Sequence, residues 1–242
     1  MDPEGKIAIV TGASLGIGRA IALAFAARGM KVVLAARTKD QLHEIAKQIH
    51  SEGGEALVCV TDVTKEDQVR NLIEATIQKY GTIDVLVNNA GVGRFKPIQD
   101  FTLVDYDYMF DVNVKGLFLC TKHAVPHLLA KGKGQIINIA SIAGKTGFKT
   151  GTLYSATKFA TVGLTWSLRE DLKEYGIAVS AICPGSVNTS FGDTPKSGDD
   201  YIEFALEPED VAHAAIFLVE ESNTANTREL ELKPRYKPRK RH

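Results

Sequence analysis

The sequence predicts an α/β chain with one doubly wound parallel sheet and helices on both faces, and three observations support this. The chain has 242 residues and 44% hydrophobic composition, enough for one sizeable core. Apolar, β-branched runs alternate with amphipathic stretches of helical period almost throughout, and strands that alternate with helices pair in parallel. The first apolar run, at 6–10, leads through a glycine-rich turn at 11–18 into a helical pattern at 20–25. This order is typical of a dinucleotide-binding, Rossmann-type fold.

The remaining elements follow from the same two patterns. Apolar and β-branched runs predict six more strands, and apolar residues three and four apart predict the helices. Residues 186–201 are rich in Gly, Ser, Asp and Pro and are expected to form a mobile loop. We therefore expect one domain over 1–232, with a substrate loop at about 186–206, and a basic tail over 233–242. The expected strands are 31–35, 56–60, 84–87, 135–140, 177–182 and 229–232, and the expected helices are 40–50, 65–80, 101–110, 114–129, 153–175 and 208–219.

Charge balance and cysteine usage narrow the class of protein. The chain has 29 basic and 29 acidic residues, so no nucleic-acid partner is expected. Its apolar runs are too short to span a bilayer, and the acidic start at 1–4 does not resemble a secretion signal. Cys59, Cys120 and Cys183 lie far apart in apolar contexts, which predicts buried free thiols in a cytoplasmic protein. For the basic tail, a solvated terminus is favoured over contact with an acidic partner.

Three glycines between the first strand and the first helix form a candidate phosphate site. Gly12, Gly16 and Gly18 have the spacing Gly-x-x-x-Gly-x-Gly. Glycine lets the backbone approach a pyrophosphate, and the helix N-terminus supplies N–H groups and partial positive charge. A plain tight turn is the alternative, but the position between a strand and a helix favours dinucleotide binding.

The end of the second strand bears on the choice of dinucleotide. A fold that selects NAD places Asp or Glu about 20 residues past the glycine loop, where it binds the ribose 2′-hydroxyl. Ala36 occupies that place and Arg37 follows it. A guanidinium can donate to a 2′-phosphate, and such a charge-assisted hydrogen bond contributes roughly 1.5–3 kcal/mol. We therefore expect NADP(H) as the cofactor; the alternative is that Arg37 is an ordinary solvated charge.

A tyrosine and a lysine on one predicted helix form a candidate proton-transfer pair. Tyr154 and Lys158 are four residues apart, so their side chains share one face. A nearby ammonium favours the phenolate, and a phenol with a lowered pKa can exchange protons near neutrality. The alternative for such a pair is a packed ring beside a solvated amine.

A pair of histidines is the other candidate for ligand chemistry. His123 and His127 are four apart on a predicted helix, a spacing that can bind a metal ion. No carboxylate lies between them, Pro126 interrupts the helix and no third ligand is evident, so no metal site is expected.

Taken together, the motifs resemble the short-chain dehydrogenase/reductase family in order and spacing, over about residues 5–220. Within it the chain is most similar to the β-ketoacyl-carrier-protein reductase and general carbonyl reductase branches. The ending at 229–234 resembles the branch that reduces assorted aldehydes, ketones and small hydroxy acids. The motifs are the glycine loop, Asn88-Asn89-Ala90-Gly91, Asn113, Ser141, Tyr154-x-x-x-Lys158 and Pro184-Gly185.

The resemblance implies a catalytic set of Asn113, Ser141, Tyr154 and Lys158. Tyr154 would exchange a proton with the substrate oxygen as hydride moves to or from the nicotinamide. Lys158 would lower the phenol pKa and hold the nicotinamide ribose, and Ser141 would hydrogen-bond the carbonyl oxygen. Asn113 would hold a water that links Lys158 to solvent. From the residues alone, Ser141 could instead be a strand-end cap and Asn113 a helix cap or buried amide.

The resemblance also implies which residues hold the cofactor. Those of the glycine loop would hold the phosphates, and others would border the adenine, its ribose and the nicotinamide carboxamide. The full set is Gly12, Ser14, Gly16, Ile17, Gly18, Arg37, Asp62, Val63, Asn89, Ala90, Gly91, Tyr154, Lys158, Pro184, Gly185, Val187 and Thr189.

The expected function is transfer of hydride from NADPH to the carbonyl of a ketone or aldehyde, with an acyl thioester among the candidate substrates. The substrate pocket would be lined by residues 93–97, 143–150 and the 186–201 loop. The helices at 114–129 and 153–175 would form a face between copies in a homodimer or homotetramer. A non-enzymatic NADP(H)-sensing protein is one alternative, although a sensor needs neither Ser141 nor Tyr154. An NAD-linked secondary-alcohol dehydrogenase is the other.

Overall fold

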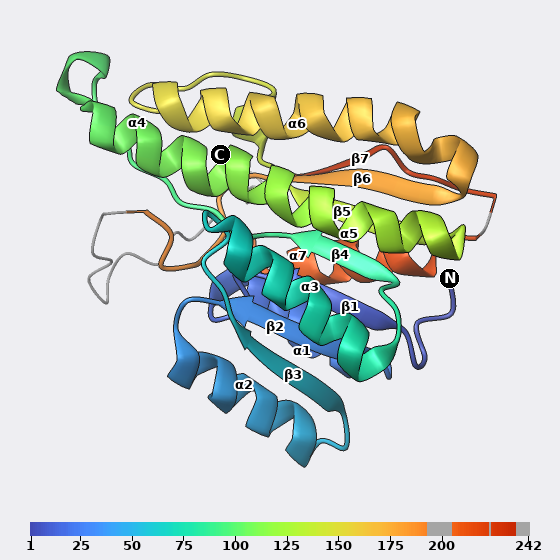
Figure 1. The fold of residues 1–242 in the computed structure, drawn as a ribbon. Coiled ribbons are helices and arrows are strands. Elements are labelled where there is room, and N and C mark those ends of the chain that lie inside the picture. Colours follow the sequence, from blue (N-terminus) through green and yellow to red (C-terminus); the bar gives the residue numbers. More distant parts are fainter. Residues whose placement is uncertain (193–204, 223, 236–242) are drawn as a thin grey trace, which may run out of the picture.

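The protein is described by a computed structural model that covers residues 1–192, 205–222 and 224–235. In these residues seven strands form one sheet in the order β3-β2-β1-β4-β5-β6-β7, and every neighbouring pair is parallel. Figure 1 shows the sheet twisting between helices. The strands are β1 (Ile7–Thr11), β2 (Lys31–Ala36), β3 (Glu55–Val60), β4 (Val85–Asn88), β5 (Gly134–Ile139), β6 (Ile177–Pro184) and β7 (Glu229–Leu232).

Helices cover both faces of the sheet (Figure 1). Side chains of α1, α2 and α7 pack on one face, and side chains of α3, α5 and the end of α6 pack on the other. The predicted fold class is therefore confirmed. The helices are α1 (Gly16–Ala26), α2 (Lys39–Ser51), α3 (Glu66–Tyr80), α4 (Leu103–Phe110), α5 (Leu117–Lys131), α6 (Thr152–Leu172) and α7 (Pro208–Glu220).

The alternation of side chains along β1 explains the two-sided core. Ala8 and Val10 belong to the apolar layer under α1 and α7, while Ile7 and Ile9 belong to the layer under α3 and α5. Successive side chains of a strand point to opposite faces. Because both faces are covered, every position of β1 is buried, and the strand is continuously apolar rather than alternating.

One element differs from its predicted form. The sequence predicts separate helices at 101–110 and 114–129, but α4 continues through a π-helical turn, Asp111–Gly116, directly into α5. Residues 110, 111, 116 and 117 all keep right-handed helical dihedrals, so the helix widens instead of ending. Single π-helical turns inside α-helices are frequent at functional sites, and this one carries Asn113.

Some of the other sequence predictions differ from the structure, and some concern residues that it does not describe. Helix α1 begins at Gly16, inside the glycine-rich turn, rather than at residue 20. Cys120 and Cys183 are buried free thiols, whereas Cys59 is only partly buried. Most of the expected loop at 186–201, and all of the tail beyond residue 235, lie outside the described residues. Across the described ranges, no helix combines the length and the apolar character needed to cross a membrane.

Candidate active site

The carboxyl ends of β1, β4, β5 and β6 meet at one edge of the sheet, where the strand order reverses between β1 and β4. Open α/β sheets bind ligands at such a point. A cavity of about 860 Å³ lies there, within the roughly 300–1,000 Å³ usual for small-molecule sites. Of the predicted residues, the cavity is lined by Gly12, Ser14, Gly16, Ile17, Arg37, Asp62, Val63, Asn89, Ala90, Gly91, Ser141, Tyr154, Lys158, Pro184, Gly185, Val187 and Thr189.

The glycine loop and the start of α1 have the features of an anion site. A Cβ on Gly12 would lie 2.9 Å from the Cα of Ala90, and Gly12 has a φ of 65°, so this position requires glycine. No side chain caps the N-terminus of α1, and its first turn holds no acidic residue. The first N–H groups of α1 therefore have no side-chain acceptor, and no carboxylate in the first turn competes with a bound anion. This arrangement fits the pyrophosphate of a dinucleotide.

Gly18 lies outside the cavity lining and has a packing role. A Cβ there would collide with the carbonyl oxygen of Gly12 and the amide of Asn89. Glycine at this position lets the first turn of α1 pack closely on the loop, as the third glycine of a dinucleotide-binding turn does. Its predicted part in cofactor binding would therefore be indirect.

Thr11, which sequence analysis did not single out, joins the glycine loop to β4. Its hydroxyl accepts hydrogen bonds from the backbone N–H of Asn89 (3.0 Å) and of Ala90 (3.1 Å), and donates to the carbonyl of Val87 (3.2 Å). The Asn89 amide donates back to the carbonyls of Thr11 (2.9 Å) and Gly12 (3.2 Å). Asn89 thus fixes the shape of the phosphate loop, besides lining the cavity near the predicted ribose position.

The end of β2, where NAD-selecting folds place an acidic residue, carries Ala36 followed by Arg37. Ala36 ends β2 and is buried, while Arg37 is exposed and lines the cavity. No ion pair to Arg37 forms among the residues that the structure describes. The Asp62 carboxylate across the cavity accepts hydrogen bonds from the N–H (3.0 Å) and hydroxyl (2.8 Å) of Thr64. Its hydrogen bonds stabilise a local turn, so the guanidinium remains available to an anion.

Tyr154 and Lys158 both line the cavity and lie one turn apart in α6. The ammonium of Lys158 donates to the carbonyl of Ile139 (2.9 Å), the last residue of β5, and lies 5.7 Å from the centroid of the Tyr154 ring. Burial lowers the pKa of Lys158 to about 8. Lys158 is 6% exposed, and removal from water disfavours its charged form.

The expected lowering of the tyrosine pKa is wrong for this structure. Burial raises the pKa of Tyr154 to about 12, and the hydrogen bond with Ser141 only partly opposes this. Desolvation disfavours the phenolate, and the Lys158 ammonium is directed at the Ile139 carbonyl instead of the phenol oxygen. At neutral pH the phenol therefore keeps its proton and is poised as an acid.

Ser141 and Asn113 hold the framework around this pair. The Ser141 hydroxyl accepts from the N–H of Ala143 (3.1 Å) and makes a long bond to the carbonyl of Pro184 (3.4 Å). The Asn113 amide bonds both backbone groups of Val92 at 2.8 Å and donates to the Thr157 hydroxyl (3.0 Å). The Thr157 hydroxyl in turn donates to the Tyr154 carbonyl (2.8 Å). Asn113, in the π-helical turn, therefore holds the start of α6 in place. It does not itself line the cavity.

Three phenylalanines lie around the Tyr154 ring. The ring centroids of Phe95, Phe148 and Phe191 lie 5.3, 6.5 and 5.6 Å from that of Tyr154. All three line the cavity. They come from the three segments expected to form the substrate pocket, but nothing in the sequence indicated that their rings would meet.

A model of the family described as short chain dehydrogenase matches residues 6–199. The chain belongs to this family. It is 39% identical over 229 residues to an uncharacterized oxidoreductase of Staphylococcus aureus, covering 95% of this chain and 97% of that protein. This short chain dehydrogenase is therefore an oxidoreductase with the expected fold.

Two solved structures are similar over nearly the whole chain. An alcohol dehydrogenase from the archaeon Thermococcus sibiricus, complexed with 5-hydroxy-NADP, has a TM-score of 0.90 and 30% identity, covering 98% of this chain and all of that one. A 3-ketoacyl-(acyl-carrier-protein) reductase from Brucella melitensis, complexed with NADH, has a TM-score of 0.86 and 32% identity, with 95% and 97% covered. Similar folds in this family thus accompany different substrates and both nicotinamide cofactors.

Proposed function

We propose that this chain is an NADP(H)-dependent carbonyl reductase acting on a ketone or aldehyde. The observation that carries the proposal is one cavity that is lined both by the glycine loop and Arg37 and by Tyr154, Lys158 and Ser141. NADP(H) fits the uncapped N-terminus of α1 and the guanidinium of Arg37, which also lines the cavity. When bound, it would supply or accept the hydride.

The chain's own residues would hold the carbonyl and transfer the proton. The hydrogen bond from the Ser141 hydroxyl to the Pro184 carbonyl is long, at 3.4 Å, so this hydroxyl can turn toward the substrate oxygen. It would then be a hydrogen-bond donor at the atom where negative charge develops. Tyr154 would then donate its proton to that oxygen. An alkoxide is a stronger base than a phenolate, so a phenol with a pKa of about 12 still gives up its proton readily to it. Lys158, charged below pH about 8, would stabilise the phenolate left behind.

Oxidation of NADPH against a panel of aldehydes, ketones and β-ketoacyl thioesters tests the proposal. We expect at least one class to be reduced in a stoichiometric reaction that yields the alcohol. Absence of turnover across the panel, with NADPH bound tightly, would instead support the sensing protein. The three free thiols favour a reducing compartment, the cytoplasm, as the place of this activity.

Cofactor choice is expected to depend on Arg37. Replacing it with alanine should weaken NADPH binding about 10- to 100-fold, the loss of a charge-assisted hydrogen bond to the 2′-phosphate, and leave NADH binding unchanged. Fluorescence titration of both cofactors measures this. The matched control is Lys39→Ala, which removes a positive charge two residues away that does not line the cavity.

Equal losses for NADPH and NADH in the Arg37 variant would show that Arg37 does not select the cofactor. A wild type that binds NADH as tightly as NADPH would favour the NAD-linked alcohol dehydrogenase. The NADH complex of the Brucella melitensis reductase makes that comparison necessary.

We further propose that α5 and α6 form a contact between two copies of the chain. Phe118 on α5 and Phe159 and Trp166 on α6 are 50%, 49% and 43% exposed, and large exposed apolar side chains are candidates for a protein contact. Sedimentation equilibrium should give the mass of a dimer or tetramer. Phe118→Asp and Phe159→Asp should shift it toward the monomer, while thermal melting shows that the variants fold. A monomeric wild type would overturn this proposal.

A further inference from the structure

An aromatic wall stands over the catalytic tyrosine. It consists of Phe95, after β4, Phe148, before α6, and Phe191, after β6. These residues are 40%, 48% and 40% exposed. The ring centroid of Phe95 lies 5.9 Å from that of Phe148 and 6.5 Å from that of Phe191, so Phe95 is the central ring of the wall. Three large apolar side chains half-open to solvent at one cavity mark a binding surface for an apolar group.

Resting on the reductase function above, we propose that the substrate carries an aryl group and that this wall binds it. Aromatic rings prefer tilted or edge-to-face partners with centroids about 4.5–7 Å apart. The wall already has that spacing around Tyr154, so a ring joined to the carbonyl by a short chain can pack there. Lys149, which follows Phe148 and also lines the cavity, is exposed.

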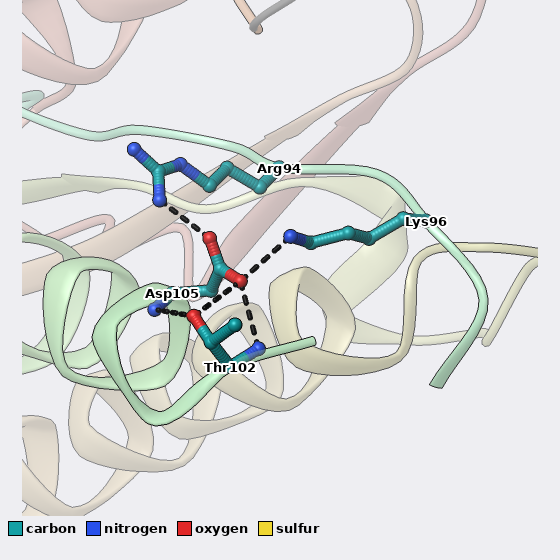
Figure 2. Close-up of polar contacts among 4 residues, drawn as sticks. All are labelled: Arg94, Lys96, Thr102 and Asp105. Atoms are coloured by element: carbon teal, nitrogen blue, oxygen red, sulfur yellow. Dashed lines mark hydrogen bonds and ion pairs between the residues drawn. The ribbon is translucent and has the colours of Figure 1, made fainter. Parts of the chain in front are cut away.

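A buried carboxylate holds Phe95 in the wall. Figure 2 shows Asp105, in the first turn of α4, reaching the residues on both sides of Phe95. Its Oδ1 lies 2.5 Å from Arg94 Nη1, and its Oδ2 lies 2.6 Å from Lys96 Nζ. The same carboxylate accepts from the N–H and hydroxyl of Thr102 at 2.8 Å. The Asp105 side chain is only 4% exposed, and the Lys96 ammonium, the Thr102 N–H and the Arg94 guanidinium hold its pKa well below the usual range.

The segment carrying Phe95 is also tied to the segment carrying Phe148. The N–H of Lys96 donates to the carbonyl of Thr150 (3.0 Å). Thr150 has a φ of 66°, the left-handed region that a β-branched residue seldom adopts. Strained residues of this kind persist where the surrounding structure holds them and gather at binding sites. Asp105 is therefore a positioning residue, which fixes two sides of the aromatic wall without touching the substrate.

A matched pair of ketones tests the substrate class. 4-Phenylbutan-2-one and butan-2-one share a methyl ketone and differ in the ring. With NADPH, kcat/KM for the aryl ketone should exceed that for butan-2-one by about 10- to 200-fold, the range that a filled hydrophobic pocket provides. Phe95→Ala and Phe148→Ala should each lower this ratio several-fold, because the aryl ketone loses a contact that butan-2-one does not make. Phe217→Ala, which removes an equally exposed ring from α7, is the control and should not change the ratio.

Calorimetry with 4-phenylbutanamide and butanamide makes the same comparison without turnover. The aryl inference would be overturned if compounds with and without the ring were reduced and bound equally well. A preference for a β-ketoacyl thioester that the variants leave intact would overturn it too. In both cases the reductase function would stand. Ring-dependent binding without reduction of either ketone would overturn the reductase function instead.

Asp105→Asn tests the positioning role, because asparagine keeps the shape and one acceptor but loses the charge. The KM for 4-phenylbutan-2-one should rise about three- to ten-fold, with kcat and the KM for butan-2-one nearly unchanged. Asp105→Glu should restore part of the loss. The control, Thr102→Ala, removes the helix cap but keeps both ion pairs; an equal rise in KM there would show that Asp105 acts only through the stability of α4.

Discussion

A Tyr154→Phe variant is expected to reduce carbonyl compounds about 10²- to 10⁴-fold more slowly than wild type, the usual contribution of a positioned proton donor. The change removes one hydroxyl and keeps the ring, so the contacts with Phe95 and Phe191 remain. NADPH affinity and KM should change little, because the lost interaction matters in the transition state. Single-turnover NADPH oxidation and a cofactor titration measure the two effects separately.

The control is Tyr108→Phe, the same chemical change in another tyrosine that lines the cavity. It should keep wild-type turnover. A Tyr154→Phe enzyme that retains more than about a tenth of the activity would be inconsistent with a dedicated proton donor. The proton would then come from Ser141 or from water, and the proposed roles in the site would have to be reassigned.

The fold could be predicted because its strands are buried on both faces. Such strands are continuously apolar, and their alternation with amphipathic helices leaves a doubly wound sheet as the natural arrangement. The parallel sheet also explains why the predicted site residues come together. Thr11, Asn88, Ile139 and Pro184 end parallel strands, so the residues after them meet at one edge of the sheet although they are far apart in the sequence.

The features of the site that could not be predicted from the sequence depend on contacts between side chains and backbone of distant segments. The spacing of Tyr154 and Lys158 placed them on one face of a helix but did not show that Lys158 would bond the Ile139 carbonyl or that burial would raise the phenol pKa. The π-helical turn at Asn113 contains no proline, and its glycine, Gly116, is its last residue, so the sequence did not indicate that the helix widens there. Likewise, the contact of Asp105 with Arg94 and Lys96 resembles ordinary surface charge until the fold buries the carboxylate.

A Lys158→Met variant is expected to be more stable than wild type at neutral pH, although inactive. Burial lowers the pKa of Lys158 from 10.5 to about 8, and the unfolded chain keeps the ordinary value. Between pH 8 and 10.5 the unfolded state binds more protons, so the stability of wild type rises with pH across that window. Below pH 8 the folded protein holds a desolvated ammonium, which costs about 3.5 kcal/mol at roughly 1.4 kcal/mol per pKa unit.

Methionine fills similar space without the charge, but it leaves the Ile139 carbonyl without the donor that lies at 2.9 Å in wild type. An unsatisfied buried carbonyl costs about 1–3 kcal/mol, so the net gain at pH 7 should be about 0.5–2.5 kcal/mol, and it should shrink toward zero or reverse at pH 10.5. Urea unfolding at both pH values measures this. Lys47→Met, at an exposed position of α2, should stay within about 0.5 kcal/mol of wild type at both pH values.

A Lys158 variant that is less stable at pH 7, or whose difference from wild type does not depend on pH, would show that the ammonium is solvated in the folded protein. In that case Lys158 could not stabilise a buried phenolate at Tyr154 as strongly as the proposed proton transfer requires.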